Sequence, residues 1–225
     1  MAELKSAAIF DLDGTLIPHT SAEKTFIFYL LRNGILSPLN LVQMFAAIWK
    51  TRGNLHAITR VNKAYLKNKD YQKLQDIARI YFEPRIDDFV FPQMRDRINQ
   101  HRARGDLLLL LTGTLDLIAA CFVRKLQLHG YKATTLEVCR GEYTGNVCGI
   151  MPYGIGKLEV LRELKKEYQF DPDSSFLYAN VYSDRFVMNA VEYPIAVNPD
   201  HKLRKYAKRF GWEILDVKAG KPFFH

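Results

Sequence analysis

Two aspartates stand one residue apart near the start of the chain: Asp11 and Asp13 follow the apolar run of residues 7–10 and precede Gly14. An apolar run bounded by turn residues predicts a short buried strand, and ligands bind at the carboxyl ends of strands in open α/β sheets. Two carboxylates this close repel each other, so a divalent cation, a shared proton or solvent must offset the repulsion. Taken alone, the pair is equally compatible with a solvated turn, because Asp-Gly is a common turn pair.

Later stretches supply other groups that bind phosphate: strand-end hydroxyls, backbone amides near glycine, and a lysine at a helix start. In chain order they are Thr112-Gly113-Thr114, Gly154-Ile155-Gly156-Lys157 and Ala179-Asn180-Val181-Tyr182-Ser183-Asp184. The first follows the continuous apolar run of residues 107–111, which is typical of a strand covered on both faces. Together with the aspartate pair, this order indicates a phosphate site.

The order of these motifs, opened by Asp11-Leu12-Asp13-Gly14-Thr15-Leu16, resembles that of the haloacid dehalogenase (HAD) superfamily of phosphohydrolases. The resemblance covers nearly the whole chain and is greatest to the phosphoserine-phosphatase-like branch, subfamily IB. It implies a Rossmann-like α/β core and a helical cap inserted after the first motif. It also implies a Mg²⁺-dependent phosphomonoesterase that acts through an aspartyl-phosphate on a small phosphorylated metabolite or a lipid phosphate.

Alternating strands and helices also predict a parallel, doubly wound sheet. We expect residues 1–17 and 96–225 to form the core domain and residues 18–95 the helical cap. In the cap, glycine is scarce and apolar residues recur at helical spacing. The expected helices there are 21–33, 38–49, 55–66 and 71–82, and a further helix, 88–99, returns to the core. The core continues with helix 115–129, a hairpin turning at 143–146, helix 157–168, strand 176–179, helix 185–191, strand 195–197, helix 202–209 and strand 212–215.

The first motif suits nucleophilic catalysis. Asp11, with an ordinary pKa of about 3.9, is ionised at neutral pH and needs no base to activate it. A bound Mg²⁺ would offset its repulsion from an anionic phosphate. Asp13 would protonate the leaving alcohol and later deprotonate water, which requires a raised pKa. The Thr112 hydroxyl and the Gly113 amide would bind phosphate oxygens, and Lys157 would place a cation against the phosphate and Asp11.

The fourth motif departs from the family pattern, which has a metal-binding aspartate where this chain has Asn180. The metal ligands that the resemblance implies are then Asp11, the Asp13 backbone carbonyl and Asn180, with Asp184 contributing directly or through water. An amide oxygen coordinates a cation without adding charge, so we expect a weaker metal site. The alternative is a catalytically weakened protein that binds a phosphorylated ligand or a protein partner. A phosphoacceptor signalling domain is disfavoured, because its acceptor aspartate follows a middle strand.

The sequence constrains the leaving group of the substrate less than it constrains the phosphate site. In the phosphoserine phosphatases that the chain resembles, an acidic residue soon after the first motif holds the substrate amine. The matching position here is Thr20, with Glu23 three residues later. That puts phosphoserine in doubt, and the basic, aromatic cap suits a lipid phosphate or a polyol phosphate equally. His19 lies next to the turn, at the pocket mouth or on the surface.

The net charge of +8 favours anionic partners. Nucleic acid is not expected, because no stacking-aromatic motif or reading helix is present. No 18-residue uncharged apolar stretch predicts a membrane span. Residues 18–95 nevertheless carry about twice as many Lys and Arg as Asp and Glu, which allows peripheral contact with an anionic membrane, although packing against the core is favoured.

Three cysteines argue against a disulfide framework, and no signal-peptide pattern is seen, so we expect a cytoplasmic protein. Nothing indicates the oligomeric state.

Overall fold

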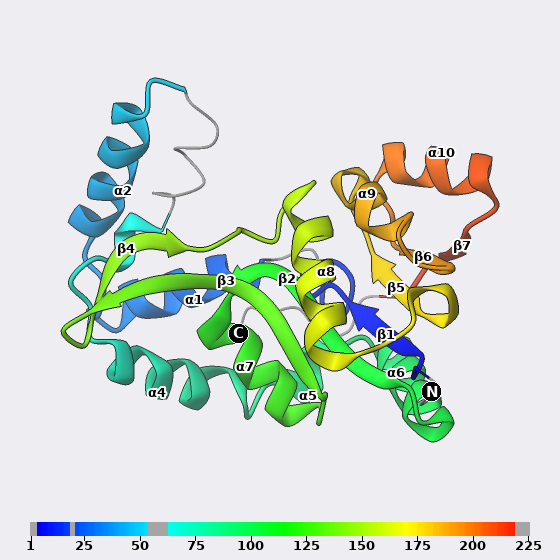
Figure 1. Ribbon diagram of the computed structural model, residues 1–225. Helices are drawn as coiled ribbons and strands as arrows, with labels where there is room; N and C mark the ends of the chain where they lie inside the picture. The colour runs from blue at the N-terminus through cyan, green and yellow to red at the C-terminus, as the bar shows by residue number, and fades with distance from the viewer. Residues whose placement is uncertain (1–3, 19–20, 54–62, 219–225) are drawn as a thin grey trace.

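A mostly parallel sheet organises the computed structural model, which describes residues 4–18, 21–53 and 63–218 (Figure 1). The sheet has seven strands in the order β4-β3-β2-β1-β5-β6-β7. β3 and β4 pair antiparallel, and the other neighbouring strands pair parallel. The strands are β1 (Ala7–Phe10), β2 (Leu107–Leu115), β3 (Gly130–Cys139), β4 (Glu142–Cys148), β5 (Phe176–Ala179), β6 (Tyr193–Val197) and β7 (Glu213–Leu215). This arrangement confirms the predicted α/β fold class.

Helices cover both faces of the central strands. Every residue of β1 is buried, with Ala8 and Phe10 in one hydrophobic cluster and Ala7 and Ile9 in a second on the opposite face. The first cluster includes residues of α6 (Pro92–Arg104) and α7 (Asp116–Lys125). The second includes residues of α8 (Gly156–Tyr168), α9 (Arg185–Met188) and α10 (His201–Phe210). The two layers fix the carboxyl ends of β1 and β5 side by side.

The segment between β1 and β2 is helical, as predicted. It contains α1 (Ala22–Arg32), α2 (Pro38–Lys50), the 3₁₀ turn η1 (Ala64–Leu66), α4 (Tyr71–Phe82) and α5 (Ile86–Phe89) before α6. The starts follow local rules: the Ser21 and Asp70 side chains cap α1 and α4, and Pro38 occupies the first turn of α2. Part of the predicted helix 55–66 lies outside the described residues. The division into cap 18–95 and core stays a prediction, and α6 runs across its boundary.

Aromatic side chains join this helical segment to the sheet layer. Phe26 of α1 lies against Tyr81 and Phe82 of α4, and the Phe82 ring centroid is 5.9 Å from that of Phe122 in α7. All four residues belong to the same hydrophobic cluster as β1. The helices after the first motif are therefore held against the core by a continuous apolar contact.

The β3–β4 hairpin turns at Arg140-Gly141, so the turn predicted at residues 143–146 is wrong. Arg140 and Gly141 both have positive φ, of 51° and 83°, as a tight hairpin turn requires. Tyr143 is instead a buried residue of β4, where its backbone exchanges hydrogen bonds with Asn68 and Lys69 of the helical segment. Pairing with the helical segment between β1 and β2 therefore overrides the turn signal of the local sequence.

The observed ends of several other elements also differ from the predicted ones. The helix predicted over 88–99 begins at Pro92 and runs to Arg104, because proline favours the first helical turn and the short α5 precedes it. The strand predicted to end at residue 111 continues to Leu115, which pairs with Thr134 of β3. Consequently α7 is shorter than the predicted helix 115–129, and α9 likewise ends at Met188 rather than residue 191.

Candidate functional site

Asp11 lies at the carboxyl end of β1, at the point where the chain turns. Its backbone N–H donates to the carbonyl of Tyr178 in β5 at 2.9 Å, which anchors the residue between the two strands. Gly14, with φ of 81°, donates its N–H to the Ile17 carbonyl at 2.8 Å and closes the turn. The side chain of Asp11 is only 10% exposed. The turn therefore holds a buried carboxylate at the predicted end of the sheet.

Lys157 connects two carboxylates, one that follows β1 and one in the loop after β5. Its Nζ lies 3.1 Å from Asp11 Oδ1 and 2.9 Å from Asp184 Oδ2, and all three side chains are buried. Burial alone would lower the pKa of Lys157, but the two carboxylates outweigh it and raise that pKa. Burial likewise raises the pKa of Asp11 and of Asp184, against the opposing effect of Lys157. Three of the predicted site residues therefore meet in one charged cluster.

Asp13 is held by two donors from elements far apart in the chain. Its Oδ1 accepts from the Ala22 N–H at the start of α1 at 2.7 Å, and its Oδ2 accepts from the Thr114 hydroxyl at 2.5 Å. Burial raises the pKa of Asp13, and these hydrogen bonds only partly oppose the rise. A raised pKa is what a carboxyl group needs to exchange a proton with an alcohol near neutral pH. The direction of the shift matches the requirement set out for Asp13.

Thr114 is a site residue that the sequence interpretation missed. In the motif Thr112-Gly113-Thr114, the sequence predicts a phosphate-binding role for the Thr112 hydroxyl and the Gly113 amide but assigns none to Thr114. In the structure Thr112 is buried and its Oγ1 accepts from the Thr114 N–H at 3.2 Å, while the Gly113 carbonyl accepts from the Thr134 hydroxyl at 2.7 Å. The sequence does hold a signal for Thr114. It is the second hydroxyl of the motif, and because Thr114 lies two residues after Thr112 in the same strand, both side chains share one face of the sheet.

The fourth motif follows β5 beside the first. Asn180 is buried, and its Oδ1 lies 3.4 Å from the Thr15 hydroxyl of the first motif. The Asn180 carbonyl accepts from the Asp200 N–H at 2.9 Å, and the Asp200 carboxylate accepts from the Tyr182 N–H at the same distance. Asp200 also caps α10. The cap of α10 thus fixes the loop that carries Asn180 and Asp184.

The donor set suits a hard cation better than a soft one. Within residues 4–18, 21–53 and 63–218, no group of three or more His, Cys, Asp or Glu residues could hold a metal ion. The oxygens present are the carboxylates of Asp11 and Asp184, the Asn180 amide and the Asp13 backbone carbonyl, and oxygen is the ligand that Mg²⁺ prefers. When ionised, Asp11, Asp13 and Asp184 carry more negative charge than the Lys157 ammonium offsets, and burial raises the pKa of each of the three. A Mg²⁺ ion held by these donors would have two carboxylate ligands, Asp11 and Asp184, and an uncharged amide ligand at Asn180.

Three residues were predicted to concern the substrate: His19, Thr20 and Glu23. His19 and Thr20 fall outside the described residues. Glu23 of α1 is not free: its carboxylate accepts from Lys63 Nζ at 2.5 Å and from the Tyr65 hydroxyl at 2.6 Å. The charge of Glu23 contributes to the raised pKa of Asp13, which indicates that this cluster lies close to the first motif. The Glu23 carboxylate is thus already paired with the ammonium group of Lys63.

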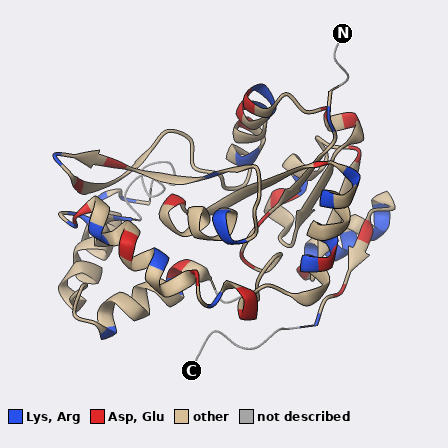
Figure 2. Ribbon diagram, turned by 90° about the horizontal axis from the view of Figure 1, so that it is seen from below, with Lys and Arg blue, Asp and Glu red and all other residues tan. Residues whose placement is uncertain are grey.

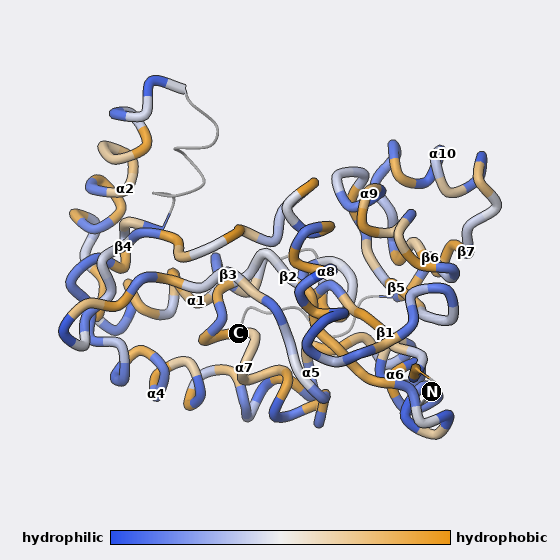
Figure 3. Tube along the Cα trace, in the orientation of Figure 1, coloured by the Kyte–Doolittle hydropathy of each residue, from blue (hydrophilic) through white to orange (hydrophobic). Residues whose placement is uncertain are grey.

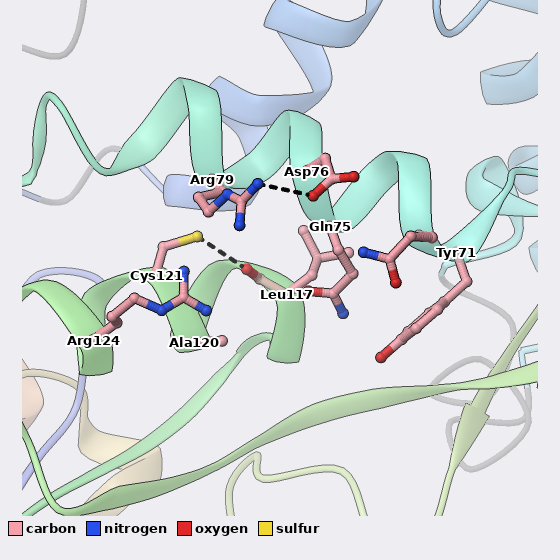
Figure 4. Close-up of a pocket in the computed structure, with 9 residues that line it drawn as sticks. Tyr71, Gln75, Asp76, Arg79, Leu117, Ala120, Cys121 and Arg124 are labelled. Atoms are coloured by element: carbon pink, nitrogen blue, oxygen red, sulfur yellow. Dashed lines mark hydrogen bonds and ion pairs between the residues drawn. The ribbon is translucent and has the colours of Figure 1, made fainter.

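A separate cavity of about 190 Å³ between α4 and α7 lacks these features (Figure 4). Arg79 pairs with Asp76, and Arg124 pairs with Glu83, so neither guanidinium is available to an anion without breaking an ion pair. Burial raises the pKa of the Cys121 thiol to about 12, which makes it a poor nucleophile. Neither the guanidinium groups nor the thiol of this cavity therefore offers the chemistry found at the ends of β1 and β5.

Comparison with known proteins identifies the family of the chain. The chain matches the haloacid dehalogenase-like hydrolase family over residues 8–188. A protein of Mycobacterium tuberculosis named phosphoserine phosphatase is 27% identical over 225 residues, which cover 97% of this chain and 73% of that protein. A histidinol-phosphatase of Neisseria meningitidis is 27% identical over 223 residues, which cover 96% of this chain and all of that protein.

Solved structures share the fold. A protein of unknown function from Bordetella pertussis superposes with a TM-score of 0.82 at 23% identity, covering 95% of this chain and 99% of its own. A phosphoserine phosphatase solved as an analogue of its phospho-aspartyl intermediate gives a TM-score of 0.61 at 17% identity, covering 97% and 96% of the two chains. At these identities the likeness concerns the architecture alone.

Proposed function

Because the chain belongs to the haloacid dehalogenase-like hydrolase family and is a phosphoric monoester hydrolase, we propose that it cleaves phosphate esters with Asp11 as the nucleophile. The observation that carries this proposal is the contact between Lys157 Nζ and Asp11 Oδ1, at 3.1 Å in a buried site. A lysine there lowers the repulsion between an incoming phosphate dianion and the attacking carboxylate. Thr112 and Gly113 complete the proposed phosphate site.

In the proposed first step, an Asp11 carboxylate oxygen bonds to phosphorus as the bond to the ester oxygen breaks. Asp13 donates its proton to the departing alkoxide, so the alcohol leaves neutral. In the second step Asp13 accepts a proton from water, the water oxygen bonds to phosphorus, and the bond between phosphorus and Asp11 breaks. Mg²⁺, held by Asp11, Asn180 and the Asp13 carbonyl, would supply positive charge near the transferred group. Thr114 and the Ala22 N–H keep the Asp13 carboxyl group oriented throughout.

We infer that the substrate is a small phosphorylated metabolite or a lipid phosphate whose recognition does not require an amine at Glu23. The substrates named for two relatives, phosphoserine and histidinol phosphate, both carry an amine on the carbon next to the phosphate-bearing carbon. Here the carboxylate of Glu23 is bonded to Lys63 and Tyr65. A substrate amine would have to displace the Lys63 ammonium, which favours polyol or lipid phosphates as substrates.

The proposal is tested by hydrolysis of p-nitrophenyl phosphate with added Mg²⁺ and with a chelator, comparing the native chain with Asp11→Asn. We expect Mg²⁺-dependent turnover that Asp11→Asn abolishes. Turnover unchanged in Asp11→Asn would refute the assignment of the nucleophile. A panel containing phosphoserine, histidinol phosphate, glycerol phosphate and lysophosphatidate then ranks leaving groups with and without an amine.

The second candidate function is a catalytically weakened protein that binds a phosphorylated ligand or a protein partner. Asn180 favours it, because an amide contributes no charge to a metal site. The two functions differ in one measurement: this candidate predicts saturable binding of a phosphate mimic without turnover of any compound in the panel.

A further inference from the structure

Helix α2 exposes an apolar stripe. Leu39, Val42, Phe45 and Trp49 are 61%, 59%, 64% and 86% exposed, and steps of three or four residues place them along one side of the helix. The other side packs, since Leu41 and Met44 contact the hydrophobic cluster of the core. No residue of α2 is buried. The helix is therefore apolar on two sides, one of which faces solvent.

The position of α2 makes this stripe accessible. The helix stands at the end of the molecule opposite β7 and points away from the sheet (Figure 1). Apolar segments run along it in the same view (Figure 3). Among the described residues, no helix is long and apolar enough to cross a membrane. Because the four stripe residues are exposed, a partner can reach them from solvent.

The charged residues in the segment that carries the stripe have one sign. Residues 33–63 contain no Asp or Glu, and Lys50 and Arg52 follow the end of the stripe. Both side chains are exposed. Elsewhere, basic and acidic residues are interspersed along the ribbon (Figure 2). The stripe is thus an apolar surface with only cationic neighbours in its own segment.

We propose that α2 docks the protein on an anionic lipid surface, with Leu39, Val42, Phe45 and Trp49 inserted between headgroups and Lys50 and Arg52 at the lipid phosphates. Helices with an apolar face and basic residues lie in this way at the membrane interface, where tryptophan is also enriched. Juxtamembrane basic residues add attraction to anionic lipids. The proposal does not depend on the catalytic assignment.

Charge argues against a second copy of the chain as the occupant. Two copies whose α2 helices pack parallel would bring Lys50 and Arg52 of each copy together, and in either orientation segment 33–63 has no acidic residue to pair with them. Like charges brought together in this way oppose association. An anionic bilayer instead complements both the apolar stripe and its basic end.

The test uses the full chain and vesicles of phosphatidylcholine alone or of equal parts phosphatidylcholine and phosphatidylglycerol. Phe45→Asp alters the stripe, and Ile80→Asp is the matched control, because Ile80 of α4 is also 64% exposed. In flotation we expect binding to the anionic vesicles alone. We expect Phe45→Asp to weaken it on the order of tenfold and Ile80→Asp to leave it unchanged. Absence of native binding, or equal loss in both variants, would overturn the proposal.

A second readout follows Trp49 itself. The chain has two tryptophans, Trp49 and Trp212. In the variant Trp212→Phe, all tryptophan fluorescence therefore comes from Trp49. We expect its fluorescence to shift to shorter wavelength with anionic vesicles and not with phosphatidylcholine. An unshifted spectrum in both, or a dimer in sedimentation velocity that Phe45→Asp dissolves, would assign the stripe to another occupant. Unchanged p-nitrophenyl phosphate hydrolysis by Phe45→Asp in solution would show that docking and catalysis are separate.

Discussion

Asn180 is the residue whose replacement has the most direct consequence for a metal ion. We predict that Asn180→Asp binds Mg²⁺ at least about tenfold more tightly, because it adds a charge to a buried oxygen donor. At an effective dielectric constant of about 20 and a separation of about 4 Å, one charge against a divalent ion is worth roughly 8 kcal/mol of gross attraction. Desolvation offsets most of that. The measurement is a Mg²⁺ titration followed by thermal unfolding and, separately, by phosphatase activity.

Two comparisons control for effects of Asn180→Asp other than metal binding: its unfolding temperature without Mg²⁺, and the variant Asn180→Ala. Without Mg²⁺, a further carboxylate near Asp11 and Asp184 raises the repulsion inside the site, so Asn180→Asp should unfold at a lower temperature than the native chain. Asn180→Ala removes the amide oxygen without adding charge and should bind Mg²⁺ more weakly than either. Equal Mg²⁺ affinities for Asn180→Asp and the native chain would contradict the assignment of Asn180 to the metal site.

Thr114 gives a prediction about positioning. Thr114→Val keeps the shape of the side chain but removes the hydroxyl that donates to Asp13 Oδ2. We predict that kcat falls by about tenfold to a hundredfold with little change in KM, because Asp13 loses the orientation it needs for proton transfer. Thr114→Ser keeps the hydroxyl and should restore most of kcat. A fall in kcat that Thr114→Ser shares would instead indicate a packing role.

At the scale of elements, a buried ion pair ties α1 to the segment before η1. Glu23 and Lys63 have side chains that are 13% and 8% exposed, and Tyr65 donates to the same carboxylate. We predict that Lys63→Met lowers the free energy of unfolding by about 3–5 kcal/mol, because it leaves a buried charge without its partner. The double variant Glu23→Gln/Lys63→Met should recover much of this loss in urea unfolding. A double variant as unstable as Lys63→Met would mean that the loss comes from packing.

A second buried network joins α6, the start of β2 and β5. His101 Nδ1 lies 2.7 Å from Asp106 Oδ2, and Nε2 lies 2.7 Å from the Tyr178 hydroxyl. Burial lowers the pKa of His101, and Arg104 and Arg97 lower it further, while Asp106 opposes them. The neutral ring can then donate to Asp106 and accept from Tyr178. This network fixes the strand that carries the fourth motif.

The lowered pKa of His101 gives stability a defined pH dependence. The folded-state pKa lies below the unfolded value of about 6.5, so the unfolded chain binds the proton more readily. The contribution of His101 is therefore complete above about pH 6.5 and is lost as pH falls through that value towards the folded pKa, by up to about 1.4 kcal/mol per pH unit. His101→Gln should flatten this part of the curve in urea unfolding between pH 5 and 8. Parallel curves for the two proteins would contradict the shift.

The elements that the sequence predicts best are those whose patterns are local. The buried strands β1 and β5 follow from short apolar runs, and α4 and α8 from apolar residues at helical spacing. The hairpin turn was predicted wrongly, because Gly145-Asn146 carries as good a turn signal as Arg140-Gly141. What decides between them is the pairing of β4 with residues 68–71. That contact is not encoded in the hairpin itself.

At the scale of the whole molecule, the site is assembled from segments that meet only in the folded chain. Motif order predicted that Asp11, Lys157 and Asp184 would converge, and the structure places a carboxylate oxygen of each aspartate within 3.1 Å of Lys157 Nζ. The partner of Asp13 could not be predicted in the same way, since Thr114 lies 101 residues away in sequence. The engagement of Glu23 by Lys63 is equally non-local. Sequence spacing predicts which strands end at the site, and tertiary contacts determine what each side chain there is bonded to.

Because β1, β5 and α8 all contribute to the site, a ligand bound there should stabilise the molecule as a whole. We predict that Mg²⁺ with beryllofluoride, a mimic of a phosphoryl group on aspartate, raises the unfolding temperature. At a concentration 100 times the dissociation constant, binding to the folded state adds about 2.7 kcal/mol. In a chain of this length that corresponds to roughly 5–10 °C. Asp11→Asn lacks the carboxylate that the mimic requires and should show no shift beyond that of Mg²⁺ alone. A shift in the native chain without phosphatase turnover would favour the ligand-binding candidate, and an equal shift in Asp11→Asn would place the mimic at another site.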